Sequence, residues 1–161
     1  MTVPRRLTAS LQAYRIGDAK GRWPVFSSDG ARRVSGRWHD VGDQVIYASE
    51  RYSTAMLETL VRWNGPPPGS QQFVRIEIPA GTSCEIANPD TIPGWQLQDS
   101  PTARRFGHQW YVERRSAILM VPSVVVRLER NIIINTNHPG FRRLTRGAET
   151  PVWWDERLFI G

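Results

Sequence analysis

Glu58 is the residue of this sequence whose type and setting most invite a chemical explanation. It is the only carboxylate in the short, mostly apolar run TAMLETL at residues 54–60. Helical periodicity places it roughly opposite the apolar face of that run, with Arg62 one turn further on. The apolar face comprises Met56, Leu57, Leu60 and Val61. Helix geometry alone predicts a solvated ion pair, whereas a cleft wall would let the carboxylate stabilise positive charge in a ligand.

Two further residues have side chains that suit a ligand. Arg15 stands late in the amphipathic run LQAYRI, just before Gly17, and a guanidinium at a strand end can bind a phosphate. The alternative is a surface arginine on the polar face of the strand. Ser123 follows Pro122 at the start of an apolar run, where its hydroxyl caps the backbone or bonds a ligand. No Gly-x-Ser-x-Gly elbow surrounds Ser123, which argues against a hydrolase-type nucleophile.

Two polar segments could contribute to a nucleotide site. SGRWHD at residues 35–40 combines the guanidinium of Arg37 with the aromatic plate of Trp38, and stacking plus charge is how proteins hold nucleotides. The alternative is a hairpin loop with a buried tryptophan. NTNHPGF places Asn135 and His138 in a polar turn, and the alternative there is an ordinary hydrogen-bonded turn.

Several kinds of site are disfavoured by the residues present. His39, His108 and His138 lack metal-ligand spacing, and the single cysteine, Cys84, excludes a zinc site built on paired cysteines. We therefore expect no metal. No Rossmann glycine motif, Walker loop or His-Glu-x-x-His motif occurs, so a dinucleotide would not be bound in Rossmann fashion.

Strands and two helices must position these residues. The expected strands cover residues 11–16, 44–48, 72–78, 117–121, 123–128 and 131–135. One helix is expected from about Glu50 to Trp63, with Ser49 as its N-cap. The other is expected over 101–115, with Ser100 as its cap, Pro101 at its first position and an inner face of Phe106, Trp110 and Tyr111. Strands outnumber helices without strict alternation, which predicts an α+β fold.

Length and composition indicate one compact domain over residues 1–161. The chain has 161 residues, 40% of them apolar, and its one proline-rich loop is too short for a domain linker. No apolar run is long enough to cross a membrane, and no apolar segment follows the charged N-terminus, so we expect a cytoplasmic protein. The net charge of +6 suits nucleic acid, an acidic partner or a phosphate-bearing ligand.

The chain resembles the RES-domain family in seven motifs that occur in the same order. They are YRIG, SGRWHDVGDQVIYASE, STAMLETL, ARRFGHQW, VPSVVV, NIIINTNHPGF and WWDERL. The family is named for an arginine, a glutamate and a serine, which match Arg15, Glu58 and Ser123. The resemblance covers about residues 11–158. Two positions depart from the family's pattern, Ser35 where a glycine is frequent and Thr136 where a proline is frequent.

The resemblance implies a fold, an activity and a partner. It implies the ADP-ribosyltransferase toxin fold, a split and mostly antiparallel sheet with flanking helices. It implies the toxin of a bacterial type II toxin–antitoxin system, which cleaves NAD by hydrolysis or phosphorolysis and so arrests growth. Transfer of ADP-ribose from NAD to a protein is the alternative. The implied partner is an Xre-type antitoxin that blocks the active site, and DNA would be contacted only through that antitoxin.

The resemblance also suggests roles for the candidate residues. Arg15 and Arg37 would bind the NAD phosphates, and Glu58 would stabilise the ribosyl cation that forms as nicotinamide leaves. Trp38 and Tyr47 would stack on nicotinamide or adenine, and Ser123 would bond nicotinamide or its ribose. Asn135 and His138 are expected to bind NAD without an assigned role. A non-catalytic nucleic-acid binder is the lower-weight alternative, and it predicts salt-dependent binding of DNA or RNA.

Overall fold

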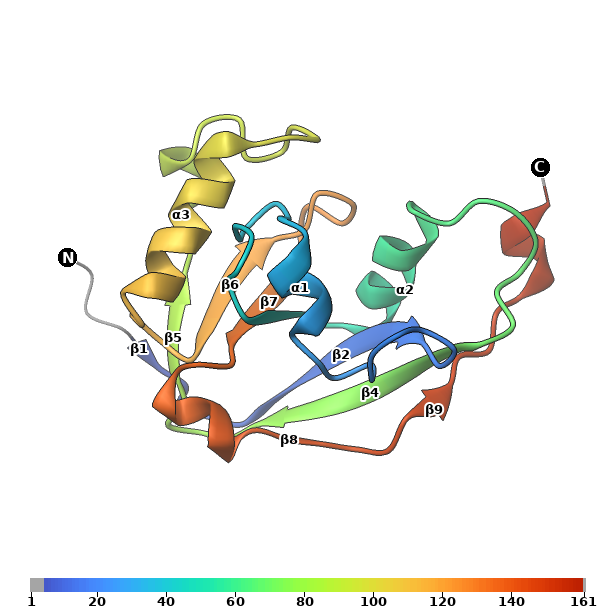
Figure 1. The fold of residues 1–161 in the computed structure, drawn as a ribbon, viewed down its shortest axis with the longest axis horizontal. Helices are drawn as coiled ribbons and strands as arrows, with labels where there is room; N and C mark the ends of the chain where they lie inside the picture. Colours follow the sequence, from blue (N-terminus) through green and yellow to red (C-terminus); the bar gives the residue numbers. More distant parts are fainter. Residues whose placement is uncertain (1–4, 161) are drawn as a thin grey trace.

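Nine strands and three α-helices make up the fold in a computed structural model that describes residues 5–160 (Figure 1). The strands are β1 (Arg5–Arg6), β2 (Leu11–Asp18), β3 (Val45–Ser49), β4 (Gln71–Ile78), β5 (Ser83–Ile86), β6 (Ile118–Pro122), β7 (Arg130–Asn135), β8 (Thr145–Arg146) and β9 (Thr150–Pro151). The α-helices are α1 (Asp29–Arg33), α2 (Tyr52–Leu60) and α3 (Pro101–Val112). Three short 3-10 helices cover Pro89–Thr91 (η1), Pro139–Arg143 (η2) and Glu156–Phe159 (η3).

The strands form one mixed sheet that nearly divides in the middle. Its order is β1-β5-β6-β7-β3-β2-β4-β8, with β9 also beside β4, and every pairing is antiparallel except β5 with β6. β2 pairs with β4 along its whole length but with β3 only at Tyr14 and Ser49. The predicted α+β fold with a split, mostly antiparallel sheet is therefore confirmed.

The core lies on both faces of β7. Ile132 and Ile134 pack into one buried cluster, and Ile133 packs into a second cluster with Trp110 of α3. All three isoleucines are fully buried, as the unbroken apolar run in this strand predicts. α3 begins as predicted, with Pro101 in its first turn and the Ser100 hydroxyl accepting a hydrogen bond from the backbone N–H of Ala103 at 3.3 Å.

Some predicted elements are wrong. Residues 123–128 form no strand but a loop between β6 and β7, closed by a hydrogen bond from the Ser123 N–H to the Glu129 carbonyl at 3.0 Å. Leu128 in this loop is 99% exposed. α3 ends at Val112, three residues earlier than predicted, and a positive φ at Arg114 turns the chain away. β5 has no match among the predicted strands, since its four residues are too few for a clear alternation.

The orientation of α2 also differs from the prediction. Thr54 and Ala55 are its buried residues, whereas Leu57 is 42% exposed and Val61, just past the helix, is 61% exposed. The helix therefore packs on the sheet through small and polar side chains. The small ones allow the helix to approach the sheet closely, and the polar ones form hydrogen bonds with residues outside the helix. Ser49 does not cap it, because Ser49 is the last residue of β3 and the N-cap position is Arg51.

No helix within residues 5–160 is long and apolar enough to cross a membrane.

Candidate active site

The carboxylate of Glu58 is held by two side chains from outside its own helix. Its Oε1 accepts hydrogen bonds from the Ser123 hydroxyl at 2.7 Å and from the Asn131 amide at 2.9 Å. Its Oε2 lies 3.8 Å from Nη2 of Arg62, which confirms the predicted i,i+4 ion pair. The Glu58 side chain is only 19% exposed, whereas that of Arg62 is 79% exposed. Glu58 is thus part of a cavity wall and not a solvated helix residue.

Ser123 links Glu58 to the loop between β6 and β7. Its hydroxyl donates to Glu58 and accepts from the backbone N–H of Val126 at 3.0 Å, and Ser123 is fully buried. Because its O–H donates a hydrogen bond to the carboxylate, Ser123 orients Glu58, and the bond it accepts from Val126 fixes the start of the loop. Nothing in this geometry suits a serine nucleophile, in agreement with the missing elbow motif.

Asn131 is the site residue that the sequence prediction missed. It stands first in the strand run NIIIN, pairs with Ser49 across β3 and β7, and accepts a hydrogen bond from the Ser49 hydroxyl at 2.8 Å. This leaves its amide N–H for Glu58. The available signal was a polar residue at the end of an otherwise apolar strand, but only the strand pairing shows where it points.

Arg15 spans the gap between the two halves of the sheet. Its Nε donates to the Val25 carbonyl at 2.5 Å, and its Nη1 donates to the Tyr47 carbonyl on β3 at 2.9 Å. No ion pair to Arg15 occurs among residues 5–160. Burial lowers the pKa of the Arg15 guanidinium to about 10, and the positive charge of Arg62 adds to the effect. Arg15 is therefore a desolvated cation whose remaining N–H groups suit an anion.

Two adjoining cavities meet at these residues. The larger has a volume of about 810 Å³, within the usual range for small-molecule sites, and lies between α1, α2 and the loops that follow β6 and η1. The smaller, of about 80 Å³, lies between α2 and the split of β2 and β3. Both are lined by Arg15, Tyr47, Glu58, Arg62 and Asn131. Ser123 does not itself line either cavity; it joins the site by holding Glu58.

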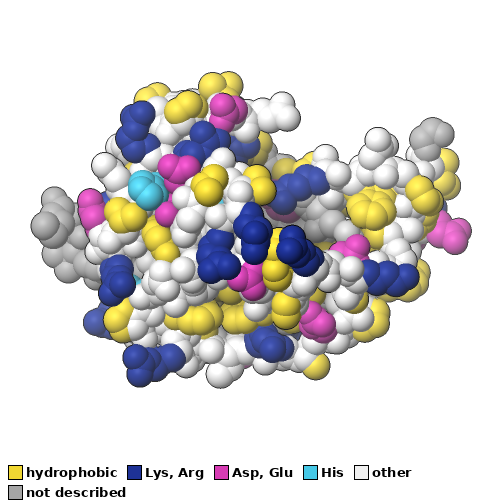
Figure 2. Space-filling view, viewed as in Figure 1, with side chains coloured by type: hydrophobic (Ala, Val, Ile, Leu, Met, Phe, Trp, Pro, Cys, Tyr) yellow, Lys and Arg dark blue, Asp and Glu magenta, His cyan; other side chains and the backbone are white. Residues whose placement is uncertain are grey.

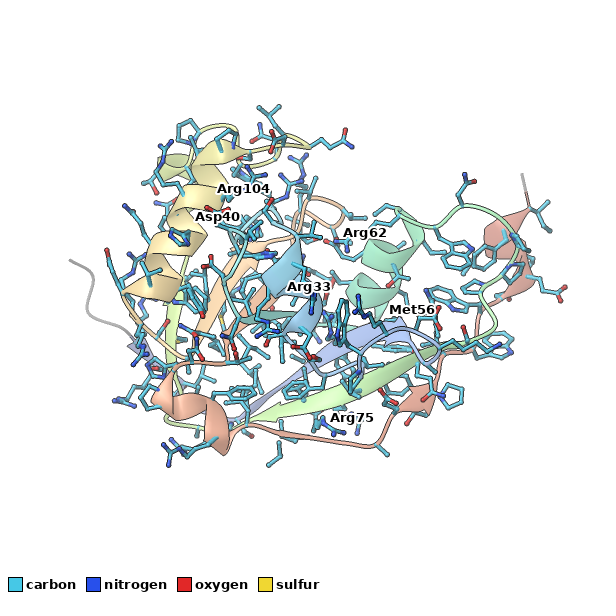
Figure 3. The ribbon with its side chains drawn as sticks, viewed as in Figure 1. Arg33, Asp40, Met56, Arg62, Arg75 and Arg104 are labelled. Atoms are coloured by element: carbon cyan, nitrogen blue, oxygen red, sulfur yellow. The ribbon has the colours of Figure 1, made fainter. Side chains whose placement is uncertain are left out.

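The surface is hollowed beside α2. Figure 2 shows a depression between the part of the molecule that carries α2 and the part that carries α1 and α3, with Lys or Arg side chains on its rim. Figure 3 labels Arg62, just past the end of α2, and Arg33, the last residue of α1, on the two sides of this depression. The rim is thus cationic where a phosphate-bearing ligand would enter.

The structure separates the roles of Arg37 and Trp38. Arg37 lines the larger cavity, and its Nη1 donates to the carbonyls of Trp95 and Leu97, which ties that loop to the site. Burial lowers the pKa of Arg37. The Trp38 residue is 2% exposed, and its ring packs against Trp95 and Phe106. Trp38 also borders the larger cavity, although its ring is largely covered by Trp95 and Phe106, as the interpretation of a buried tryptophan in a loop expects.

Tyr47 lines both cavities, and its hydroxyl is bonded inside the protein. The hydroxyl oxygen accepts from the Trp38 N–H at 3.1 Å and lies 2.7 Å from Nδ1 of His39. Burial raises the pKa of Tyr47, so the phenol remains protonated at neutral pH. What Tyr47 offers a ligand is an aromatic face.

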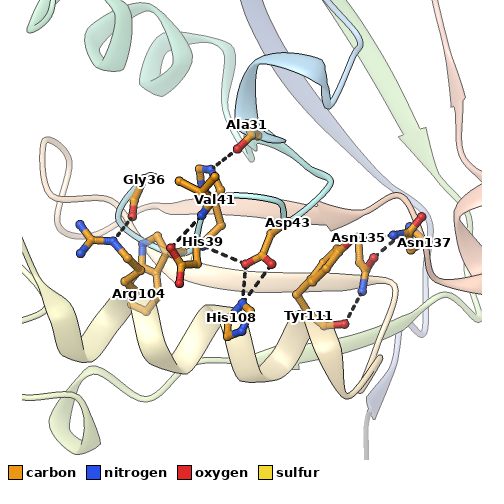
Figure 4. Close-up of polar contacts among 12 residues, drawn as sticks. Ala31, Gly36, His39, Val41, Asp43, Arg104, His108, Tyr111, Asn135 and Asn137 are labelled. Atoms are coloured by element: carbon orange, nitrogen blue, oxygen red, sulfur yellow. Dashed lines mark hydrogen bonds and ion pairs between the residues drawn. The ribbon is translucent and has the colours of Figure 1, made fainter. Parts of the chain in front are cut away.

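Asn135 and His138 lie outside both cavities. In the β3–β7 pairing Asn135 is opposite Val45, whereas Asn131 is opposite Ser49, so four residues or about 13 Å separate the two asparagines. The Asn135 amide bonds the Tyr111 carbonyl at 3.2 Å and the Asn137 N–H at 2.9 Å (Figure 4). His138 caps η2, since its Nδ1 accepts from the Gly140 N–H at 2.9 Å. The structure does not bring this pair to the site.

No group of three or more His, Cys, Asp or Glu residues within 5–160 could hold a metal ion.

Two named proteins are similar to this chain over most of its length. A protein called Prs ADP-ribosylating toxin, from Sphingobium sp. strain YBL2, is 37% identical over 160 residues, which is 95% of this chain and 94% of that protein. A protein called Toxin Res, from Pseudomonas putida strain KT2440, is 36% identical over 139 residues, 83% of this chain and 92% of that protein.

A solved structure and a family model extend the comparison. The fold is similar to a chain in the crystal structure of the M. tuberculosis MbcT-MbcA toxin-antitoxin complex, with a TM-score of 0.62 at 16% identity. The similarity covers 90% of this chain and 85% of that chain. The family model described as RES domain matches residues 12–155. With nearly the whole chain matched, and with Arg15, Glu58 and Ser123 at one site, this chain belongs to the RES domain family.

Proposed function

We propose that this chain is the toxin of a toxin–antitoxin pair and that it cleaves NAD at the bond between nicotinamide and ribose. The observation that carries the proposal is that Arg15 and Glu58, distant in sequence, line one cavity of suitable size and that Ser123 holds Glu58 there by a hydrogen bond. The relatives called toxins and the relative called an ADP-ribosylating toxin support the same assignment.

Glu58 is suited to the reaction because of the charge that develops. When the C–N bond breaks, its electron pair goes to the nicotinamide nitrogen, which becomes neutral, and the ribose becomes an oxocarbenium-like cation. The leaving nicotinamide needs no proton, so no general acid is required. What lowers the barrier is a carboxylate beside the ribosyl cation. Ser123 and Asn131 hold that carboxylate in place before the substrate arrives, as electrostatic stabilisation requires.

The cations of the cavity suit the pyrophosphate of NAD. Arg15 is half-buried without an ion pair among residues 5–160, Arg37 lines the larger cavity, and Arg62 is exposed at its rim. Guanidinium groups bind phosphate oxygens through paired hydrogen bonds, so these three provide a clamp from three different elements. The ring of Tyr47 supplies a face on which nicotinamide or adenine can stack.

The acceptor of ADP-ribose defines a second candidate function. Water or phosphate as acceptor gives NAD hydrolysis or phosphorolysis. A protein side chain as acceptor gives protein ADP-ribosylation, which is favoured by the name of the relative that is 37% identical. A non-catalytic nucleic-acid binder has only the net charge of +6 in its favour, and a gel-shift titration at two salt concentrations tests it.

An antitoxin that covers the cavity accounts for the exposed apolar side chains around it. Val61, Leu97 and Leu128 are 61%, 58% and 99% exposed, and their segments border the larger cavity. Apolar groups beside a cationic rim suit a protein partner that has both apolar and acidic side chains. We propose that this partner is an Xre-type antitoxin, as the family resemblance implies.

The test is a product analysis of NAD labelled in its adenylate half. Purified protein is incubated with this NAD alone, with inorganic phosphate and with a bacterial lysate, and the products are separated by chromatography and by gel. Free nicotinamide together with ADP-ribose, its phosphate or a labelled protein band supports the proposal and names the acceptor. Intact NAD under all three conditions would contradict it.

A further inference from the structure

His39 is a buried histidine that has no role in the proposed cleavage of NAD. It is 4% exposed and has Tyr47 on one side. On the other side it contacts Ala31 of α1 (Figure 4). Its Nδ1 lies 2.7 Å from the Tyr47 hydroxyl oxygen. Its Nε2 lies 2.9 Å from the Ala31 carbonyl oxygen and 2.8 Å from that of Val34. Both ring nitrogens therefore have partners inside the protein.

The partners determine the direction of each hydrogen bond. A carbonyl oxygen only accepts, so Nε2 of His39 carries a hydrogen. In the neutral imidazole Nδ1 is then an acceptor, and the Tyr47 hydroxyl donates to it. Because that hydroxyl oxygen also accepts from the Trp38 N–H, the phenol is fixed at both its donor and its acceptor side.

The loop before His39 is closed so tightly that only glycine fits. A Cβ at Gly36 would lie 2.7 Å from Cε1 and 2.8 Å from Nδ1 of His39, and 2.9 Å from the Tyr47 hydroxyl. Gly36 and His39 also form a β-bridge with each other. The backbone of residues 36–39 therefore holds the imidazole of His39 against the phenol of Tyr47.

We propose that His39 is a positioning residue for the substrate. It holds two walls of the larger cavity in register: Tyr47 on β3, and α1, which contributes Gly30 and Ala31. The inference rests on the proposed function, because the ligand it concerns is NAD. His39 acts through Tyr47 and not as an acid or base, since both of its nitrogens are bonded within the protein.

The experiment compares the KM and kcat of NAD cleavage in His39→Phe, Tyr47→Phe, the double variant and His39→Gln. A stacked ring binds substrate and transition state about equally, so loss of its position raises KM and spares kcat. We expect His39→Phe and Tyr47→Phe each to raise KM about tenfold with kcat within about threefold of wild type. The double variant should be no worse than either single one, because both remove the same contact.

Two further variants separate positioning from a general loss of structure. His39→Gln retains an amide N–H for the carbonyls and an amide oxygen for Tyr47, so we expect KM to stay near the wild-type value. His108→Gln is the matched control: His108 lies on α3, bonds Asp43 and lines neither cavity, and its KM should not change. If His39→Phe does not fold, Tyr47→Phe, which removes a single oxygen atom, still measures the contact.

The outcomes distinguish the two claims. Additive effects in the double variant, an unchanged KM in Tyr47→Phe, or a fall in kcat at constant KM would each overturn the role of His39. A wild-type protein that leaves NAD intact would overturn the proposed function itself, and the role of His39 would fall with it.

Discussion

At the scale of single residues, the site is a carboxylate with one oxygen held by two donors and a cation that has no ion pair among residues 5–160. Oε1 of Glu58 has two donors, from Ser123 and Asn131, while Oε2 forms an ion pair at 3.8 Å with the exposed Arg62. Arg15 is desolvated and bonded to two backbone carbonyls. Such a pair is arranged for a ligand with a positive centre and negative phosphates.

Two substitutions at Glu58 separate its structural role from its charge. In Glu58→Gln the amide oxygen can still accept from Ser123 and Asn131, so we expect the free energy of unfolding to change by no more than about 0.5 kcal/mol. In Glu58→Ala the two donors lose their acceptor, which should cost about 1–3 kcal/mol. Urea denaturation measures both values. Equal stability of the two variants would contradict the hydrogen bonds described.

At the scale of elements, features set by neighbouring residues can be predicted from the sequence, whereas features set by tertiary contacts cannot. The N-cap of α3 and the apolar run of β7 depend on neighbouring residues, so the sequence predicts them correctly. The orientation of α2 depends instead on Thr54, whose hydroxyl donates to Glu129 at 2.5 Å, and on Tyr52, whose ring packs against Phe73. Those partners are distant in sequence, so the periodicity of α2 misidentifies its inner face.

A pair of substitutions on α2 tests which face is inside. Leu57 is 42% exposed and Ala55 is 5% exposed. We expect Leu57→Gln to change the free energy of unfolding by about 0.5 kcal/mol or little more, and Ala55→Leu to cost about 1–3 kcal/mol through overpacking. Thermal or urea denaturation of both variants gives the comparison. If Leu57→Gln lost more unfolding free energy than Ala55→Leu, the inner face predicted from periodicity would be the correct one.

The cap of η2 makes part of the stability depend on pH. Burial lowers the pKa of His138, and the positive charges of Arg114 and Arg6 lower it further. The unfolded chain, in which this pKa is about 6.5, then binds the proton more readily than the folded one. Stability should therefore rise with pH through about 6.5 and fall as pH drops below it.

The variant His138→Asn provides the comparison for this pH effect. Asparagine is a good capping residue and does not titrate. Urea denaturation at about pH 5.5 and about pH 7.5 should show a larger gain in stability for the wild type than for His138→Asn. An equal gain in both proteins would show that protonation of His138 is not coupled to folding.

At the scale of the whole molecule, the split of the sheet makes the site. β2 and β3 share one pair of residues, and the space between them is bridged by Arg15 and covered by α2. The strand patterns predict the strands on both sides of this gap, whereas the split itself is expected only from the family resemblance. The identity of Arg15, Glu58 and Ser123 as site residues came from the family resemblance, and Asn131 came from the structure alone.

The surface around the cavity predicts how a partner binds. Leu128 is 99% exposed in the loop that Ser123 anchors, so a charge there should not disturb the fold. We expect Leu128→Asp to weaken binding of an Xre-type antitoxin at least about tenfold, measured by calorimetry, and to leave NAD cleavage unchanged. Val112→Asp, at the end of α3, is the matched control, and equal effects of both variants would contradict this docking surface.

The central claim, that Glu58 serves the cleavage of NAD, is tested most directly by the rate of nicotinamide release. We expect wild-type protein and Glu156→Gln, an exposed control in η3, to release nicotinamide at equal rates. Glu58→Gln should be slower by about 10²–10³-fold although it remains folded. Nicotinamide release by folded Glu58→Gln at the wild-type rate would contradict the account.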